Sequence, residues 1–150
     1  MTTPSMARKL NAQMNLEFSA SQLYVTLSNW CMERNLTRIA LCLRHQAQSG
    51  ITHTMRVFDY IKQTGRYPII KSVNISTTAI HSIDELLQQA VENQLMRYQE
   101  LACLAEAARM ETDNTALNLL SAIYDEQKSL HEELITQMNE YSRLPVTLTR

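Results

Sequence analysis

The stretch RYPIIKSVNISTTAIH, residues 66–81, decides the fold because it separates two long helical segments without having a helical pattern itself. It contains Pro68, several β-branched and small polar residues, and no apolar repeat with the period of a helix. Its 16 residues reach roughly 50 Å when extended. An irregular loop of this length is uncommon in a compact domain unless it crosses from one end to the other. We therefore expect a crossover along a helical bundle, with parallel helices on either side of it.

Four helices are predicted around this crossover, and the signals at their ends agree with one another. Thr37 is the expected N-terminal cap of the second helix, and Gly65 is its expected left-handed C-terminal cap. Ser82 and Glu85 have the spacing of a capping box at the start of the third helix. The predicted helices are 5–34, 37–64, 82–111 and 113–143, followed by a short tail at 144–150. Short turns after the first and third helices require antiparallel hairpins, so we expect one all-α domain, 1–150, folded as a four-helix bundle.

The composition agrees with a helical protein of the cytoplasm. The chain has two glycines, three prolines and 45% hydrophobic residues, whereas β-rich folds need more turn residues. A net charge of −1 lacks the basic excess that nucleic acid or an anionic membrane surface would require. No apolar run approaches the ~20 residues of a membrane span, and residues 1–10 have no signal-peptide core. Cys31, Cys42 and Cys103 lack metal-type spacing, so we interpret them as buried thiols in a reducing compartment.

Polar residues interrupt the apolar seam of each predicted helix near its midpoint. They are Glu17 on the first helix, Gly50 and His53 on the second, Gln94 on the third and Gln127 on the fourth. A carboxylate and an imidazole in a core cost roughly several kcal/mol unless they are paired or ligated. Di-iron bundles place Glu and Glu-x-x-His residues at such a level. A hydrogen-bonded network without metal is the alternative, but the convergence of Glu17, His53 and Gln127 favours a metal site.

Short segments spread along the chain carry a family resemblance. They are KLN (9–11), QMNLE (13–17), LY (23–24), WC (30–31), LR (43–44), AQ (47–48), TH (52–53), FDY (58–60), DEL (84–86) and EQ (126–127). Together they make the sequence similar to the bacterial non-haem ferritins from Met6 to about Arg143. The resemblance implies a ferritin-like bundle that binds non-haem iron and no haem. It also implies a homo-oligomer that forms a shell, or assembly with other ferritin subunits.

The resemblance also implies a set of iron ligands. In that family the first iron is held by a Glu on the first helix and a His on the second, with a Gln nearby on the fourth. Glu17, His53 and Gln127 stand at those positions. Tyr24 matches a tyrosine beside the centre and is a candidate redox neighbour, but no catalytic residue is assigned.

Several of the family's acidic positions have lost their acids in this chain. The bridging position is Gly50, and the second iron's glutamates are replaced by Gln94 and Leu130. A further iron position has Ser49, Glu126 and Ser129. Gln94 and Glu126 are therefore weaker candidate ligands. Without a bridging carboxylate two iron ions would repel each other almost uncompensated, so we expect the paired oxidation of Fe(II) by oxygen to be slow or absent.

The expected function is iron binding and storage in intracellular iron homeostasis, with impaired or absent di-iron ferroxidase activity. Two alternatives stay open: an active ferroxidase whose modified site recruits Glu126, His131 or Gln94, and a non-catalytic bundle that binds a regulatory partner. A second apolar stripe on the first helix is the expected oligomer interface: Leu16, Ala20, Leu23, Leu27 and Trp30. The residues after Pro145 are too few for the family's short fifth helix.

Overall fold

The computed structural model describes residues 1–71 and 79–143, with side chains up to residue 141. It contains four helices, α1 Pro4–Glu33, α2 Thr37–Gln63, α3 Ile83–Met110 and α4 Asn114–Arg143. No strand occurs in these described ranges. The prediction of an all-α four-helix bundle is thus confirmed. The tail at 144–150 lies outside the described residues.

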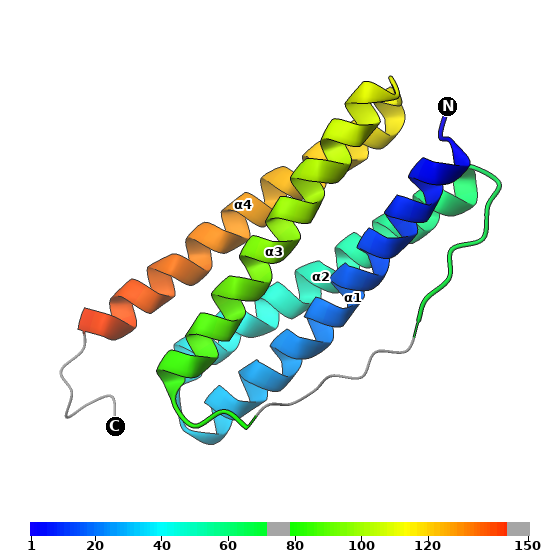
Figure 1. Cartoon of the computed structure of the whole chain (residues 1–150). Helices are drawn as coiled ribbons and strands as arrows, with labels where there is room; N and C mark the ends of the chain where they lie inside the picture. Colours follow the sequence, from blue (N-terminus) through cyan, green and yellow to red (C-terminus); the bar gives the residue numbers. More distant parts are fainter. Residues whose placement is uncertain (72–78, 144–150) are drawn as a thin grey trace.

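The direction of the helices follows from the connections between them (Figure 1). α1 and α2 form one antiparallel hairpin, α3 and α4 form the other, and α2 runs parallel to α3. The described first part of the connection after α2, up to Lys71, runs along the side of the bundle beside α1, as expected for the start of a crossover. Each hairpin helix also packs on the other hairpin, because α1 contacts α3 and α2 contacts α4.

The first part of the crossover is bound to α1 by two asparagine side chains. Asn11 accepts a hydrogen bond from the Ile69 amide at 2.8 Å and donates one to its carbonyl at 3.2 Å. Asn15 donates to the same carbonyl at 2.8 Å and accepts from the Lys71 amide at 2.7 Å. The two residues are one helical turn apart, so both face the crossover. Residues 72–78 lie outside the described residues.

The helix ends correct two of the predicted caps. α2 is preceded by Leu36, which makes no side-chain cap bond, and Thr37 is already inside the helix. At α3 the Ser82 hydroxyl accepts from the Glu85 amide, but the Glu85 carboxylate accepts from the His81 amide instead of that of Ser82. Gly65 has a φ of 84°, the left-handed conformation expected of a C-terminal cap.

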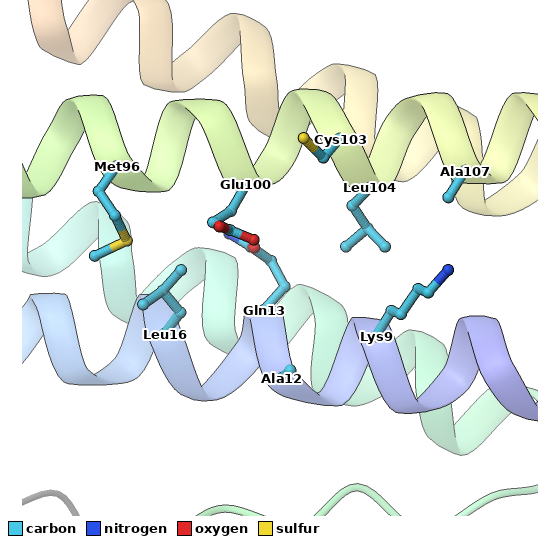
Figure 2. Close-up of a pocket in the computed structure, with 9 residues that line it drawn as sticks. All are labelled: Lys9, Ala12, Gln13, Leu16, Met96, Glu100, Cys103, Leu104 and Ala107. Carbon is cyan, nitrogen blue, oxygen red and sulfur yellow. The ribbon is translucent and has the colours of Figure 1, made fainter.

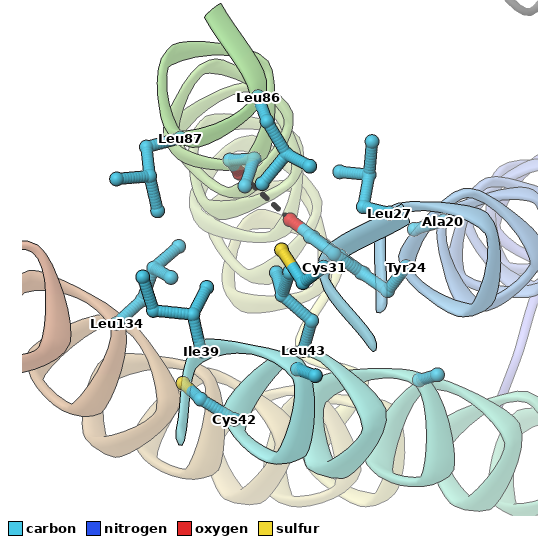
Figure 3. Close-up of a cluster of buried hydrophobic side chains, with 13 residues drawn as sticks. Ala20, Tyr24, Leu27, Cys31, Ile39, Cys42, Leu43, Leu86, Leu87 and Leu134 are labelled. Carbon is cyan, nitrogen blue, oxygen red and sulfur yellow. Dashed lines mark hydrogen bonds between the residues drawn. The ribbon is translucent and has the colours of Figure 1, made fainter. Parts of the chain in front are cut away.

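The core consists of two apolar clusters separated by a polar level. One cluster surrounds Tyr24, Leu43 and Leu86 (Figure 3), and the other surrounds Met14, Leu101 and Ile123. The buried polar side chains between them include Glu17, Ser21, Gln46, His53, Gln94, Arg97 and Gln127. Apolar packing at both ends therefore holds the polar side chains in the middle of the bundle.

Burial also corrects the interpretation of two sequence features. Ala20 and Leu27 of the expected interface stripe are each only 1% exposed and belong to the subunit core. Cys103 is exposed, whereas Cys31 and Cys42 are buried thiols as predicted. Burial raises the pKa of Cys31 to about 11 and that of Cys42 to about 12. Among the described residues, no helix is long and apolar enough to cross a membrane.

Candidate metal centre

Glu17 of α1 lies at the middle of the polar level with none of its surface exposed. Its Oε1 accepts hydrogen bonds from Gln13 Nε2 at 3.0 Å and from Gln127 Nε2 at 2.7 Å. Its Oε2 accepts from Arg97 Nη1 at 2.9 Å. Three protein donors therefore bind the carboxylate, and the predicted neighbour Gln127 is one of them.

Arg97 of α3 is the positive partner of this carboxylate and is itself only 3% exposed. Its Nε donates to Asn93 Oδ1 at 2.8 Å, and its Nη2 donates to the Tyr24 hydroxyl at 3.2 Å. Burial by itself would lower the pKa of Arg97, but Tyr24 and Glu17 oppose burial and the net shift is upward. The guanidinium is therefore a permanent positive charge inside the bundle.

Tyr24 joins the polar level to the apolar cluster beside it (Figure 3). Its hydroxyl donates to the Ala90 carbonyl at 2.8 Å, and the Arg97 guanidinium carbon lies 5.3 Å from its ring centroid. Burial raises the pKa of Tyr24, against the lowering effect of Arg97. The residue named from the sequence as a redox neighbour is thus a hydrogen-bond partner of Arg97.

His53 of α2 has a different set of partners. Its Nε2 lies 2.6 Å from Glu126 Oε2, and Arg56 Nη1 donates to both oxygens of Glu126 at 3.0 and 3.1 Å. An ionised carboxylate only accepts, so Nε2 carries the proton in this pair. The other ring nitrogen, Nδ1, is buried and has no hydrogen-bond partner among the described residues. A histidine that donates one nitrogen to a carboxylate and leaves the other free is typical of a metal ligand.

Glu126 itself is a half-exposed carboxylate, with 51% of its side chain accessible. Partial burial would raise the pKa of Glu126, but His53 and Arg56 outweigh burial and lower it. This acid therefore stays ionised near neutral pH, and two neighbouring bases already share it.

Gln94 belongs to a third group of contacts. Its Nε2 donates to Gln46 Oε1 at 2.6 Å, and His131 Nδ1 lies 2.9 Å from its Oε1. Gln46 in turn donates to the carbonyl of Leu130 at 2.9 Å. Both ends of the Gln94 amide are used in this network, and Leu130 contributes a backbone oxygen. His131 thus bonds to Gln94 from the edge of the polar level.

The helix interior glycine, Gly50, has a packing reason that the sequence did not reveal. A Cβ atom at this position would lie 3.1 Å from Ser21 Cβ and 3.2 Å from the Glu17 carbonyl oxygen. Both distances are shorter than ordinary carbon contacts. The missing side chain therefore lets α2 approach α1 closely beside Glu17.

A groove lies between α1 and α3 (Figure 2). Gln13 lines this groove and also donates to Glu17, so it separates the carboxylate from the groove. Glu100 and Cys103 line the α3 side. In the described structure the side-chain partners of Glu17 are Gln13, Gln127 and Arg97. Glu100, the acid that lines the groove, is not one of them.

The predicted ligands are therefore only partly brought together. Glu17 and Gln127 are in contact, His53 and Glu126 form a separate pair, and Gln94 belongs to the third group. Among the described residues, no group of three or more His, Cys, Asp or Glu side chains is arranged to hold a metal ion. The donor set fits a pair of metal ions poorly, because its central acid already binds a guanidinium. Sequence reasoning missed that guanidinium, although Arg97 follows Gln94 at a spacing that stays on the same helix face.

Comparisons with known proteins agree with this architecture. Residues 7–144 match the family model described as the ferritin-like domain. The chain is 42% identical over 137 residues to the bacterial non-heme ferritin-like protein of Escherichia coli (strain K12), covering 91% of this chain and 81% of that protein. It is 38% identical over 133 residues to the bacterial non-heme ferritin of Escherichia coli O157:H7, covering 89% and 79%.

Solved structures give the same result for the fold. A ferritin of Chlorobium tepidum superimposes with a TM-score of 0.86 at 29% identity, covering 95% of this chain and 87% of that one. An open pore ferritin of Archaeoglobus fulgidus has a TM-score of 0.84 at 21% identity, covering 93% and 86%, and supports the fold alone. With a family model that spans nearly the whole bundle and relatives of this similarity, the chain belongs to the ferritin family.

Proposed function

We propose that this chain is an iron-binding and iron-storage subunit whose di-iron ferroxidase activity is impaired or absent. The observation that carries the proposal is the buried pair of Glu17 and Arg97, joined at 2.9 Å in the middle of the bundle. In the described structure the positive charge of Arg97 neutralises Glu17, the acid in the middle of the polar level. Iron is the cargo of such a subunit, and the bundle's centre contributes little to its oxidation.

Charge balance explains why the centre is unsuited to two iron ions. Two divalent ions about 4 Å apart repel by roughly 16 kcal/mol at an effective dielectric constant near 20. Position 17 keeps its acid, but Gly50, Gln94 and Leu130 supply no negative charge where the family resemblance expects carboxylates. One carboxylate that also binds a guanidinium cannot offset that repulsion.

A single, weakly held ion is compatible with the remaining donors. Glu17, His53 and Gln127 are the proposed metal ligands, and the buried Nδ1 of His53, which has no partner among the described residues, supports this assignment. Gln94 and Glu126 stay the weaker candidates: Gln94 bonds to Gln46 and His131, and Glu126 bonds to Arg56 as well as to His53. No haem is included in the proposal.

Oligomer formation is the second part of the proposal. Large apolar side chains are about half exposed on α1 and α2: Val25, Met32, Leu41, Ile51 and Met55. Val25, Met32 and Ile51 line one groove between the two helices. We propose that a second copy of this chain covers this face in a cytoplasmic homo-oligomer, or that a related ferritin subunit does so in a mixed shell.

Aerobic oxidation of Fe(II) by the purified protein tests the proposed function. The expected rate equals that of buffer alone, and Glu17→Ala and His53→Ala leave it unchanged, while the wild-type oligomer retains iron after desalting. A wild-type rate well above buffer that both substitutions abolish would instead support the active ferroxidase. A monomer or dimer by light scattering that retains no iron would support the regulatory bundle.

A further inference from the structure

The positive charge at the centre of the bundle belongs to the protein itself. We propose that Arg97 is an internal counter-ion that competes with a divalent metal ion for Glu17 and so keeps the metal affinity of the centre low. This inference rests on the proposed function, because it explains why the centre does not take up a pair of iron ions. Arg97 acts on the metal through Glu17, so it is a positioning residue.

The position of the guanidinium is fixed by three separate bonds. Asn93, one helical turn earlier on α3, accepts from Nε at 2.8 Å. Tyr24 and Glu17, both on α1, accept from the two terminal nitrogens at 3.2 and 2.9 Å. A planar group held at all three nitrogens cannot move away from the carboxylate without losing these bonds together. The pair is therefore a persistent feature of the centre.

The amide side chains around Glu17 point their N–H groups, and not their oxygens, at its carboxylate. Gln13 and Gln127 both present their Nε2 atoms to Oε1, whereas an amide ligates a metal through its oxygen. A metal ion at Glu17 would have to displace at least one of these donors and would lie beside a fixed positive charge. Both requirements lower the affinity for a cation.

The two ring nitrogens of His53 support the inference independently. Its Nδ1 is buried and unpartnered in the described structure, while its Nε2 bonds to Glu126 as in a metal-bound histidine. The polar level thus contains a ring nitrogen that could bind a metal, His53 Nδ1, and a carboxylate, Glu17. Arg97 is hydrogen-bonded to that carboxylate. Removing the guanidinium should release Glu17 for a metal ion.

Co(II) titration of the purified protein, followed by visible absorption, tests this inference with an air-stable divalent probe. Arg97→Gln should bind Co(II) at least tenfold more tightly than wild type and show new d–d bands. Arg97→Lys retains the charge and should stay near the wild-type affinity. The double variant Arg97→Gln/Glu17→Gln should lose the gain. Arg109→Gln is the matched control, since Arg109 lies on the same helix but pairs with Glu106 at the surface.

The outcomes separate this inference from the proposed function. A folded Arg97→Gln oligomer with unchanged Co(II) affinity would overturn the role of Arg97. Tight Co(II) binding by wild type that Glu17→Gln abolishes would overturn it too, even if Arg97→Gln failed to fold. Iron retention by the wild-type oligomer tests the storage function alone and does not depend on either result.

Discussion

The two sides of the polar level each join an acid to basic groups, but they differ in their exposure to water. Between α1 and α3, Glu17 and Arg97 have side chains that are 0% and 4% exposed. Between α2 and α4, Glu126 and Arg56 have side chains that are 51% and 35% exposed. A charge pair in a core leaves an uncompensated charge when one partner is removed, whereas a pair open to water contributes little. We therefore expect the Glu17–Arg97 pair to matter much more to the stability of the fold than the Glu126–Arg56 pair.

The largest expected effect comes from breaking the buried pair. Glu17→Gln and Arg97→Gln should each lower the free energy of unfolding by about 3–5 kcal/mol, because each leaves a buried charge unpaired. The double variant should lose clearly less than the sum of the two, since no lone charge remains. Urea denaturation at a fixed protein concentration measures all three.

The surface pair on α3 provides the control for that cycle. Arg109→Gln removes an exposed ion pair with Glu106 and should change the free energy of unfolding by no more than about 0.5 kcal/mol. Strictly additive losses at Glu17 and Arg97, or single losses as small as that of the control, would mean that the buried pair is not coupled.

A smaller effect is expected at the glycine beside Glu17. Gly50→Glu places a Cβ 3.1 Å from Ser21 Cβ and 3.2 Å from the Glu17 carbonyl, so α1 must shift by a few tenths of an ångström. The expected loss of stability is about 1–3 kcal/mol from overpacking. Restoring this one acid should not restore rapid Fe(II) oxidation, because Arg97 still binds Glu17. A rate well above buffer in Gly50→Glu would show that the missing bridge alone disabled the centre.

The smallest effect is expected on the exposed side and depends on pH. The folded state lowers the pKa of Glu126, so its ionised form stabilises the fold at pH values above the usual Glu pKa of about 4.3. That contribution is lost as the pH falls from there through the lowered pKa. Because Glu126 is half exposed, its contribution should stay below about 1 kcal/mol.

Thermal unfolding of wild type and Glu126→Gln at several pH values checks this expectation. The difference between them should be largest near neutral pH and should disappear in acid. A difference of several kcal/mol, or one that grows as the pH falls, would mean that the α2–α4 side is as important to the fold as the α1–α3 side.

Much of the fold could be predicted because it depends on local patterns. Residues 66–81 lack a helical period and are long enough to cross the bundle, so the topology followed from this segment and from the short turns after the first and third helices. Thr37 was assigned as a cap because its residue type is favoured there, yet Leu36 precedes the helix. Cys103 was expected to be buried, but its place in the α1–α3 groove leaves it exposed. Such errors arise because residue type constrains a helix end or one helix face only loosely.

The centre was harder to predict because its chemistry depends on one side chain. Glu17 and Gln127 were expected at one level, and they are in contact. The seam spacing after Gln94 does not single out position 97, because Tyr98 also fits it and is the more apolar residue. Tyr98 instead packs edge-on against Tyr124, with ring centroids 4.4 Å apart. A buried acid without a sequence-assigned partner was the signal that a basic residue should have been sought nearby.

Anomalous diffraction from crystals of the protein soaked anaerobically with Fe(II) tests most directly whether Arg97 keeps iron away from Glu17. We expect no pair of iron peaks inside the bundle, with the Arg97 guanidinium remaining on the Glu17 carboxylate. Two peaks about 3.5–4 Å apart between Glu17 and His53, with Arg97 displaced, would contradict it.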